Sequence, residues 1–316
     1  MTPAVFLSAY AADLVIGDPR WIPHPVVIIG RFIRWIEERV RKGSFAADLK
    51  TGGILLWVIV VGVTFCVSWG VVAGSYLIHN IVGVAVTVIL ASLTVATRSL
   101  FEESRIVIDA LDRGDIVNSR RKLSMIVGRS TEHLGESEIR RAVIETVAEN
   151  LSDGIVAPLL YLALGGVPLA MAYKAVNTLD SMVGYNNELC GEIGWFSAKM
   201  DDLWNWIPAR LTGAIIILAS YILRFDGRNA GRIMMRDGRN HSSPNSGVPE
   251  AAMAGALGIQ LGGPIRYFGE LFQKPTIGDA VSPIDRGDVI RAWAVMIVSS
   301  LVMALLCAAA MGVARW

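Results

Sequence analysis

Long uncharged apolar segments alternate with polar, basic segments along the chain. Residues 52–77 carry no charged side chain, and residues 81–97 continue without one after a turn near His79 and Asn80. A helix needs about 20 mostly apolar residues to cross the hydrocarbon core of a bilayer. Residues 52–97 therefore predict two spanning helices, and residues 292–313 predict a third.

Two further segments are weaker candidates for spanning helices. Residues 206–223 are interrupted only by Arg210, whereas residues 155–176 contain four helix-breaking positions, Pro158, Gly165, Gly166 and Pro168. The opening apolar stretch, residues 3–17, is short, contains Asp13 and lacks the basic flank of a signal peptide. We therefore expect an all-α, polytopic integral membrane protein with about five transmembrane or re-entrant helices, forming a single domain over residues 1–316.

Basic residues are concentrated in three segments, residues 20–50, 98–141 and 224–286. The positive-inside rule predicts that these segments face the cytoplasm. Residues 115–127 and 137–147 show the spacing of amphipathic helices, with Ser137 as a candidate cap of the second. The side of residues 177–205 stays open: they lie outside if both weaker segments cross, but can face a cytoplasmic cavity if these segments are re-entrant.

The composition agrees with this prediction and excludes several other classes of protein. Of the 316 residues, 53% are hydrophobic and only 18% are charged, which excludes a disordered chain. Three widely spaced cysteines exclude a disulfide-stapled module, and a net charge of +1 gives no electrostatic case for nucleic acid. The usual nucleotide-binding and hydrolase motifs are missing, so a nucleotide site would have to be built in another way.

One candidate site is a set of acidic residues. Glu145, Glu149 and Asp153 recur every fourth residue, so an α-helix would place all three carboxylates on one face. A divalent cation among them would relieve their repulsion, and Mg²⁺ in proteins is held by one or two carboxylates together with phosphates. The alternative is a solvated helix face preceding a membrane segment.

A second candidate site lies at the edge of an apolar segment. Lys174, Asn177 and Asp180 share one helical face there, and Asp201 and Asp202 follow later in the chain. Ionisable groups at membrane depth are costly and suggest a function. The alternatives are the ordinary polar ends of a spanning helix and, for the aspartate pair, a helix cap.

The third candidate is a polar loop that precedes a predicted helix over residues 249–261. It offers guanidinium, imidazole, amide and hydroxyl groups that suit a phosphate, from Arg236, Arg239, Asn240, His241, Ser242 and Ser243. Two shorter stretches carry further candidates, Arg20 and His24 beside three prolines, and Arg129 in a Gly-Arg-Ser-Thr sequence. Surface loops are the alternative in each case.

In combination, these segments resemble the CobD/CbiB family of cobalamin biosynthesis, the adenosylcobinamide-phosphate synthases. The matching sequences cover nearly the whole chain: GDPRWIPHPV at 17–26, VGRST at 127–131, ETVAENLSDGIVAPLLY at 145–161, AYKAVNTLDSMVGY at 172–185, DDLWNWIPARLT at 201–212 and RDGRNHSSPNSGVPEAAMAGALG at 236–258. One small departure is Trp195-Phe196-Ser197, where the family has a Phe-Gly pair.

The resemblance implies an ATP-dependent ligase. Such an enzyme joins adenosylcobyric acid to (R)-1-aminopropan-2-ol O-phosphate, or to aminopropanol, through an acyl phosphate. It implies ATP and Mg²⁺ as cofactors, with the metal on Glu145, Glu149 and Asp153. Phosphate or substrate would be bound by the arginines, histidines, serines and amides named above. Lys174 would stabilise charge, while Asp180, Asp201 or Asp202 would bind metal or accept a proton from the amine.

The same resemblance implies a multi-pass cell-membrane enzyme with its site facing the cytoplasm, and other membrane enzymes of cobalamin assembly as partners. One alternative is a Mg²⁺-dependent membrane prenyl or phosphatidyl transferase, faintly suggested by Asn177 and Asp180. That enzyme would require a lipid substrate. A transporter is a second alternative, but the sequence shows no inverted repeat.

Overall fold

The structure, a computed structural model, describes residues 1–18, 24–43, 48–184, 191–267, 270–272 and 274–313. These residues are mostly helical, and their only sheets are two short antiparallel pairs of strands. The chain divides into two compact units. Unit 1 comprises Met1–Ala96, Ala157–Asn205 and Ala304–Trp316, and unit 2 comprises Thr97–Val156 and Trp206–Met303.

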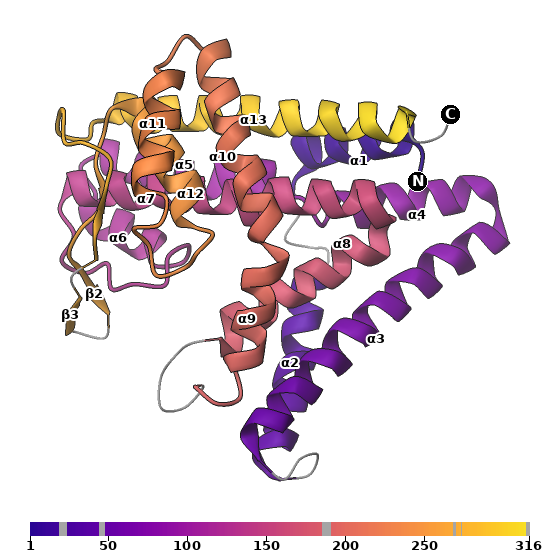
Figure 1. Cartoon of the computed structure of the whole chain (residues 1–316). Coiled ribbons are helices and arrows are strands. Elements are labelled where there is room, and N and C mark those ends of the chain that lie inside the picture. The colour runs from indigo at the N-terminus through magenta and orange to yellow at the C-terminus, as the bar shows by residue number, and fades with distance from the viewer. Residues whose placement is uncertain (19–23, 44–47, 185–190, 268–269, 273, 314–316) are drawn as a thin grey trace. The chain divides into compact units, whose positions relative to one another are not determined.

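Unit 1 is built from long apolar helices. Its helices are α1 (Pro3–Ile16), α2 (Pro25–Arg41), α3 (Leu49–Ile78), α4 (Asn80–Ser92), α8 (Ala157–Val183) and α9 (Trp195–Trp204). The Asp48 side chain caps α3 by accepting from the backbone N–H of Thr51 at 2.8 Å. Helix α3 packs against α2, α4 and α8 (Figure 1).

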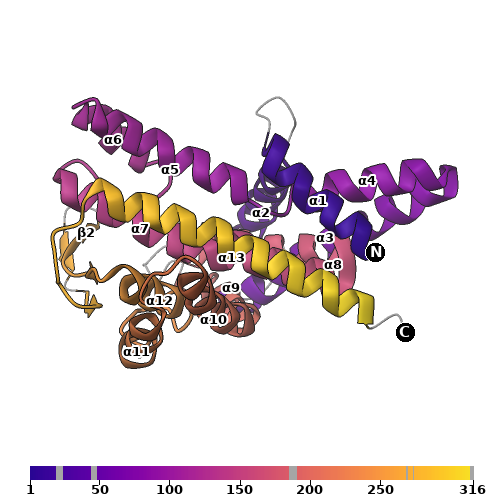
Figure 2. The ribbon, with the colours of Figure 1, turned by 90° about the horizontal axis from the view of Figure 1, so that it is seen from above.

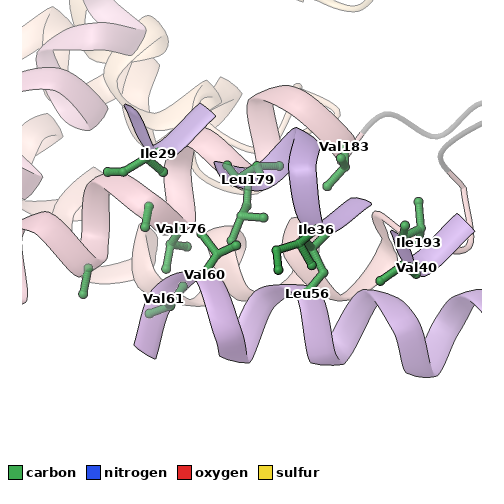
Figure 3. Close-up of a cluster of buried hydrophobic side chains, with 13 residues drawn as sticks. Ile29, Ile36, Val40, Leu56, Val60, Val61, Val176, Leu179, Val183 and Ile193 are labelled. Atoms are coloured by element: carbon green, nitrogen blue, oxygen red, sulfur yellow. The ribbon is translucent and has the colours of Figure 1, made fainter. Parts of the chain in front are cut away.

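The core of unit 1 is a cluster of branched aliphatic side chains from α2, α3 and α8, joined by Ile193 (Figure 3). Ile33, Leu56 and Leu179 are fully buried in it. Gly53 permits a close approach, because a Cβ atom at this position would lie 2.1 Å from the carbonyl oxygen of Ile193. A side chain on Gly53 would therefore push α3 away from the segment that leads into α9.

Unit 2 contains shorter helices and the strands. Its elements are α5 (Thr97–Asp112), α6 (Ile116–Leu123), α7 (Glu136–Asn150), the π-helical turn η1 (Leu151–Val156), α10 (Trp206–Ile222), α11 (Gly227–Asp237), α12 (Gly247–Leu257), β1 (Leu261–Gly262), β2 (Ile265–Tyr267), β3 (Glu270–Phe272), β4 (Thr276–Ile277) and most of α13 (Arg286–Val313). Strand β1 pairs with β4, and β2 with β3. Helices α10, α11 and α12 pack against one another, as Figures 1 and 2 show.

The expected membrane protein is confirmed. Among the described residues, four helical stretches are long and apolar enough to cross a bilayer: Leu49–Ile78, Asn80–Asp112, Glu136–Val183 and Arg286–Val313. A fifth span results if the bent pair Trp195–Trp204 and Trp206–Ile222 is counted as one crossing. The protein is thus an all-α, multi-pass membrane protein, with four or five candidate spans among its described residues where the sequence predicted about five.

The weakest predicted span is irregular, as its prolines and glycines indicated. Helix α8 is interrupted at Gly166, which has φ 67° and ψ −161° and is followed by Pro168 within the helix. Proline has no N–H to donate to the preceding turn, and glycine tolerates the positive φ that the break requires. The predicted Ser137 cap is wrong: Gly135 is the N-cap of α7, and its N–H donates to the Glu138 carboxylate at 2.7 Å.

Candidate functional site

A buried ion pair in unit 2 joins two of the sequence motifs. Arg129, in the loop before α7, donates from Nη2 to Glu145 Oε2 at 2.5 Å, and both side chains are almost fully buried. The backbone N–H of Gly262 in β1 donates to Glu145 Oε1 at 2.8 Å. The Glu145 carboxylate therefore connects the loop before α7, α7 itself and β1. Arg129 Nε is buried without a hydrogen-bond partner among the described residues.

Two further glutamates lie close to this ion pair. Glu149, one helical turn after Glu145, accepts from Ser246 Oγ at 3.1 Å. Glu250 is buried in the first turn of α12, which packs against α7. Burial raises the pKa of Glu250 well above its ordinary value, and the negative charges of Glu145 and Glu149 raise it further, while Lys274 opposes them. We call this group, Arg129, Glu145, Glu149, His241, Ser246 and Glu250, the glutamate site.

The structure does not group the three predicted carboxylates, Glu145, Glu149 and Asp153, as one metal site. Within the described part of the chain, no three His, Cys, Asp or Glu side chains are placed to hold one metal ion. Asp153 lies in the π-helical turn η1, whereas Glu145 and Glu149 belong to the regular helix α7. The acidic neighbour of those two residues is Glu250, from a helix distant in sequence.

His241 shapes the loop that enters α12. Its Nδ1 accepts from the backbone N–H of Ser243 at 3.0 Å, and its Nε2 lies 3.8 Å from Glu250 Oε1. Burial, together with the nearby charge of Lys274, lowers the pKa of His241 to about 4. The imidazole is therefore neutral at neutral pH, and the bond to Nδ1 places its proton on Nε2, facing Glu250.

The remaining loop residues fall into two groups. The Ser243 hydroxyl accepts from the backbone N–H groups of Asn245 and Ser246, at 3.2 and 3.3 Å, and so holds the turn. Three predicted phosphate ligands, Arg239, Asn240 and Ser242, are exposed. Arg210 of α10 binds Asn245 Oδ1 at 2.6 Å and lies near enough to Arg239 for their charges to interact. Two guanidinium groups thus stand beside an open loop, an arrangement suited to an anion.

Arg236 has a different environment from the one predicted. Its Nε and Nη2 donate to the two oxygens of Asp237 at 2.7 Å, and Nη2 also lies 2.8 Å from Asp279. Asp237 in turn accepts from the Gly278 N–H at 2.8 Å. These contacts lower the pKa of both aspartates. Arg236 therefore clamps α11 to the segment after β4, and its charge is balanced by protein carboxylates.

The second candidate site lies in unit 1, where α8 packs against α9. Asp201 accepts from Asn205 Nδ2 at 3.0 Å and, more weakly, from Asn177 Nδ2 at 3.5 Å. The buried hydroxyl of Tyr173 donates to Asn205 Oδ1 at 2.8 Å. We call Tyr173, Asn177, Asp201 and Asn205 the aspartate site. Its carboxylate is held by neutral amides, unlike Glu145.

Other predicted residues surround the aspartate site or lie apart from it. Asp180 and Asp202 interact electrostatically with Asp201, and Lys174 is half-buried on α8, one turn before Asn177. His24 is the N-cap of α2: its Nδ1 accepts from the N–H of Val26 at 3.2 Å, and its Nε2 lies 3.3 Å from Asp18. That position gives His24 a structural role in the fold. Arg20 lies outside the described residues.

Sequence reasoning did not assign five residues that belong to or surround these sites, one of them Ser246, which binds Glu149. Glu250 and Lys274 belong to the charge balance of the glutamate site, while Tyr173 and Asn205 complete the aspartate site. Glu250 had a visible signal, a carboxylate in the first turn of a helix otherwise rich in alanine and glycine. Lys274 had none, because it sits in a segment without motif or periodicity.

Comparison with known proteins agrees with the resemblance. Residues 6–296 match the family described as CobD/Cbib protein. A cobalamin biosynthesis protein CobD of Geobacter metallireducens is 56% identical over 282 residues, covering 89% of this chain and 88% of the relative. A cobalamin biosynthesis protein CbiB of Salmonella typhimurium is 50% identical over 316 residues, covering 99% and 98%. No solved structure matches the chain.

Proposed function

The chain belongs to the CobD/CbiB family, and from this premise we propose that it is a cobalamin-biosynthesis enzyme and an ATP-dependent acid–amine ligase. Its substrates would be adenosylcobyric acid and (R)-1-aminopropan-2-ol O-phosphate, or free aminopropanol, and its product with the phosphorylated amine would be adenosylcobinamide phosphate. The observation that carries the proposal is the glutamate site, where Arg129, Glu145 and Ser246 come from three separate motifs and meet in one buried group.

The proposed reaction has two steps. A carboxylate is a poor acyl donor, so the terminal phosphoryl group of ATP is first transferred to a carboxylate oxygen of adenosylcobyric acid, releasing ADP. The amine nitrogen then attacks the acyl carbon, the C–N bond forms, and inorganic phosphate leaves with the electrons of the C–O bond. The ammonium group of the amine must lose protons along the way, which requires a base. Each step places phosphate charge where arginines can offset it.

The residues of the glutamate site fit a phosphate and a divalent cation. Arg129 Nε is a buried donor without a partner among the described residues, which a phosphate oxygen would satisfy. Glu149 and Glu250 are close enough for their charges to repel, which a cation would relieve. We propose that these two carboxylates hold Mg²⁺ together with phosphate oxygens, with Glu145 as their neighbour. When bound, Mg²⁺ would neutralise charge on the transferred phosphoryl group.

The exposed loop after α11 would bind a second phosphate group. Arg239, assisted by Arg210, and the polar side chains of Asn240 and Ser242 are the groups that remain open there. Ser243 and His241 would act by shaping the loop, because their polar atoms are bonded to its backbone. The phosphate of the amine substrate, or of the nucleotide, is the proposed ligand.

The aspartate site is the proposed position for the base. Asp201 accepts only from neutral amides within the described contacts, so no guanidinium competes for its charge. We propose that Asp201 accepts a proton from the amine, with Asp180 and Asp202 contributing negative charge and Lys174 stabilising developing negative charge. Following the positive-inside rule, we propose that the basic segments and the glutamate site face the cytoplasm. Other membrane enzymes of cobalamin assembly are proposed as partners.

A ligation assay tests the proposal directly. Purified protein would be incubated with Mg²⁺, ATP, adenosylcobyric acid and each amine, without added lipid substrate, and the product identified by mass spectrometry. We expect an amide product with one ADP formed per amide. Glu149→Ala and Arg239→Ala should lower its rate, whereas Glu136→Ala and Arg121→Ala, at exposed positions of α7 and α6, should not. Wild-type activity in both site variants would contradict the site assignment, and a requirement for a lipid acceptor would favour a prenyl or phosphatidyl transferase.

A further inference from the structure

Unit 1 contains an apolar pocket that the proposed ligase reaction does not use. Its volume is about 390 Å³, and it lies among α2, α3, α4 and α8. The side chains that shape it include Ile28, Phe32, Val63, Val67, Leu90 and Met171. A hollow of this size between packed helices is large compared with the voids in protein cores, which rarely exceed a water molecule. It therefore has room for part of a ligand.

The lining of the pocket selects for an apolar occupant. Among the described residues no charged side chain lines it, and the two polar residues in its lining are Thr64 and Ser68. The Ser68 hydroxyl is already bonded within α3, donating to the carbonyl oxygens of Thr64 and Phe65 at 2.7 and 3.0 Å. A buried water usually needs two to four polar partners, so water would bind poorly here. The chemistry of the wall suits a hydrocarbon.

The pocket opens on the outer face of a spanning helix. Val63 and Val67 of α3 line it and keep 42% and 58% of their surface exposed. The helix α3 is long and apolar enough to cross a bilayer. The material outside such a face is lipid hydrocarbon, so the occupant that can enter from there is the acyl chain of a membrane lipid.

The same face of α2 carries a positive charge further along. The ring of Phe32 stacks on Trp35 with centroids 6.1 Å apart, and the guanidinium of Arg39 lies 3.5 Å from the centre of the Trp35 ring. Arg39 Nη1 also donates to the carbonyl oxygen of Trp35 at 2.8 Å. Neither contact neutralises the charge. Seven residues separate Phe32 from Arg39, about 10 Å along a helix, which matches the separation of a lipid phosphate from the upper part of its chain.

From this arrangement we propose that unit 1 binds an anionic phospholipid, with one acyl chain in the pocket between α2, α3, α4 and α8 and the phosphate on Arg39. Tryptophan and arginine are the side chains that anchor proteins at the headgroup level, and arginine binds phosphate oxygens with paired donors. The lipid would be a resident ligand rather than a substrate. The proposal is independent of the ligase reaction.

Photo-crosslinking tests this site. The full-length protein would be reconstituted in vesicles that contain phosphatidylglycerol or phosphatidylcholine with a diazirine on one acyl chain, and labelled peptides would be mapped by mass spectrometry. We expect labelling concentrated in residues 25–32 and 63–71, and stronger with phosphatidylglycerol. Val67→Trp should fill the pocket and lower the label about tenfold, the effect of roughly two lost methylene contacts. The matched control is Val58→Trp, at another exposed position of α3, which should leave the labelling unchanged.

Further variants separate the headgroup from the chain and guard against misfolding. Arg39→Gln should reduce phosphatidylglycerol labelling to the phosphatidylcholine level while leaving the labelled residues the same. Val63→Phe gives a second way to fill the pocket if Val67→Trp lowers the melting temperature. Even labelling along α3, labelling insensitive to both filling variants, or equal labelling by the two lipids in the wild type would each overturn the proposal.

Discussion

The glutamate site and the aspartate site use carboxylates in opposite electrostatic settings. In unit 2, Glu145 is balanced by the Arg129 guanidinium and a backbone N–H, while Glu149 and Glu250 add further buried negative charge. In unit 1, Asp201 is held by two side-chain amides, one of them anchored by Tyr173. The first setting contains charges that a phosphate and a cation could join. In the second setting, Asp201 would be available to accept a proton, as we propose. Similar acidic motifs in the sequence therefore predict different chemistry once their partners are known.

The largest expected effect comes from breaking the Arg129–Glu145 pair. Arg129→Met removes the guanidinium that is bonded to Glu145 and leaves the more distant Arg141, whose Nε lies 3.9 Å from Glu145 Oε1, while Glu145→Gln leaves Arg129 without this carboxylate. Removing one partner of a buried pair typically costs about 3–5 kcal/mol of the free energy of unfolding. We expect each single variant to melt at a clearly lower temperature in detergent and to lose ligation activity.

The double variant and a surface pair separate stability from activity here. Arg129→Met combined with Glu145→Gln should recover most of the lost stability but none of the activity. The half-buried pair Arg98–Glu102 on α5, whose side chains keep 39% and 46% of their surface exposed, is the control, because breaking a pair on a helix surface costs only about 0.5 kcal/mol. Single variants as stable as the Arg98→Met control would show that the glutamate site does not depend on this ion pair.

The second prediction concerns acid sensitivity, which only the glutamate site should show. The pKa of His241 is lowered from 6.5 to about 4, so His241 contributes stability above pH 6.5 that is lost as the pH falls toward 4. The difference corresponds to about 3 kcal/mol. His241→Asn retains an acceptor for the Ser243 N–H and should remove this loss. Melting temperatures measured between pH 7 and 4.5 provide the check.

The titration of Glu250 changes stability with pH in the opposite direction, so the experiment needs a control for it. Its raised pKa means that it contributes stability below about pH 4.5 that is lost as the pH rises through its folded value. The charges of Glu145 and Lys274 also shift the pKa of both His241 and Glu250, and the charge of Glu149 shifts that of Glu250. The His241→Asn comparison should therefore be repeated in Glu250→Gln protein, where the acid loss should be larger and still depend on His241. An acid profile unchanged by His241→Asn in both backgrounds would contradict the assignment.

The sequence predicted the elements of the fold better than the partners of its charged groups. Apolar runs and helix-breaking residues were enough to find the spans and the break at Gly166, since both depend on local physical properties. The partners of the charged groups were harder to predict, because they come from distant segments of the chain. Nothing near Arg236 indicated that Asp279 would balance its charge, and nothing near Glu149 indicated Glu250. The periodicity argument for Asp153 assumed a regular α-helix, and no pattern in the sequence indicated the π turn that the chain forms there.

The third prediction tests whether Asp201 acts as a base rather than as a structural residue. Asp201→Asn keeps the size of the side chain and removes its basicity, and loss of a general base typically lowers kcat about 100-fold or more. We expect little change in melting temperature. Tyr173→Phe is the control, because it removes the bond to Asn205 without changing the carboxylate, and it should cost about 1 kcal/mol of stability while leaving kcat nearly unchanged. Similar kcat values for Asp201→Asn and Tyr173→Phe would make the aspartate site a structural network and remove its contrast with the glutamate site.

The smallest expected effect distinguishes two arginines only three residues apart. Arg239 is exposed beside Arg210, whereas Arg236 is bonded to Asp237 and Asp279. If Arg239 binds phosphate, Arg239→Ala should raise the KM of the phosphate-bearing substrate about tenfold at an unchanged melting temperature, which is the effect of losing one charged hydrogen bond. Arg236→Ala should instead lower the melting temperature and leave that KM nearly unchanged, because it unties α11 from the segment after β4. Steady-state kinetics with the phosphorylated amine and with free aminopropanol make the comparison sharper. A rise in KM that is confined to the phosphorylated amine would locate the phosphate of that substrate on this loop. A rise of about tenfold in the KM of ATP, with the KM of both amines unchanged, would instead locate the nucleotide there.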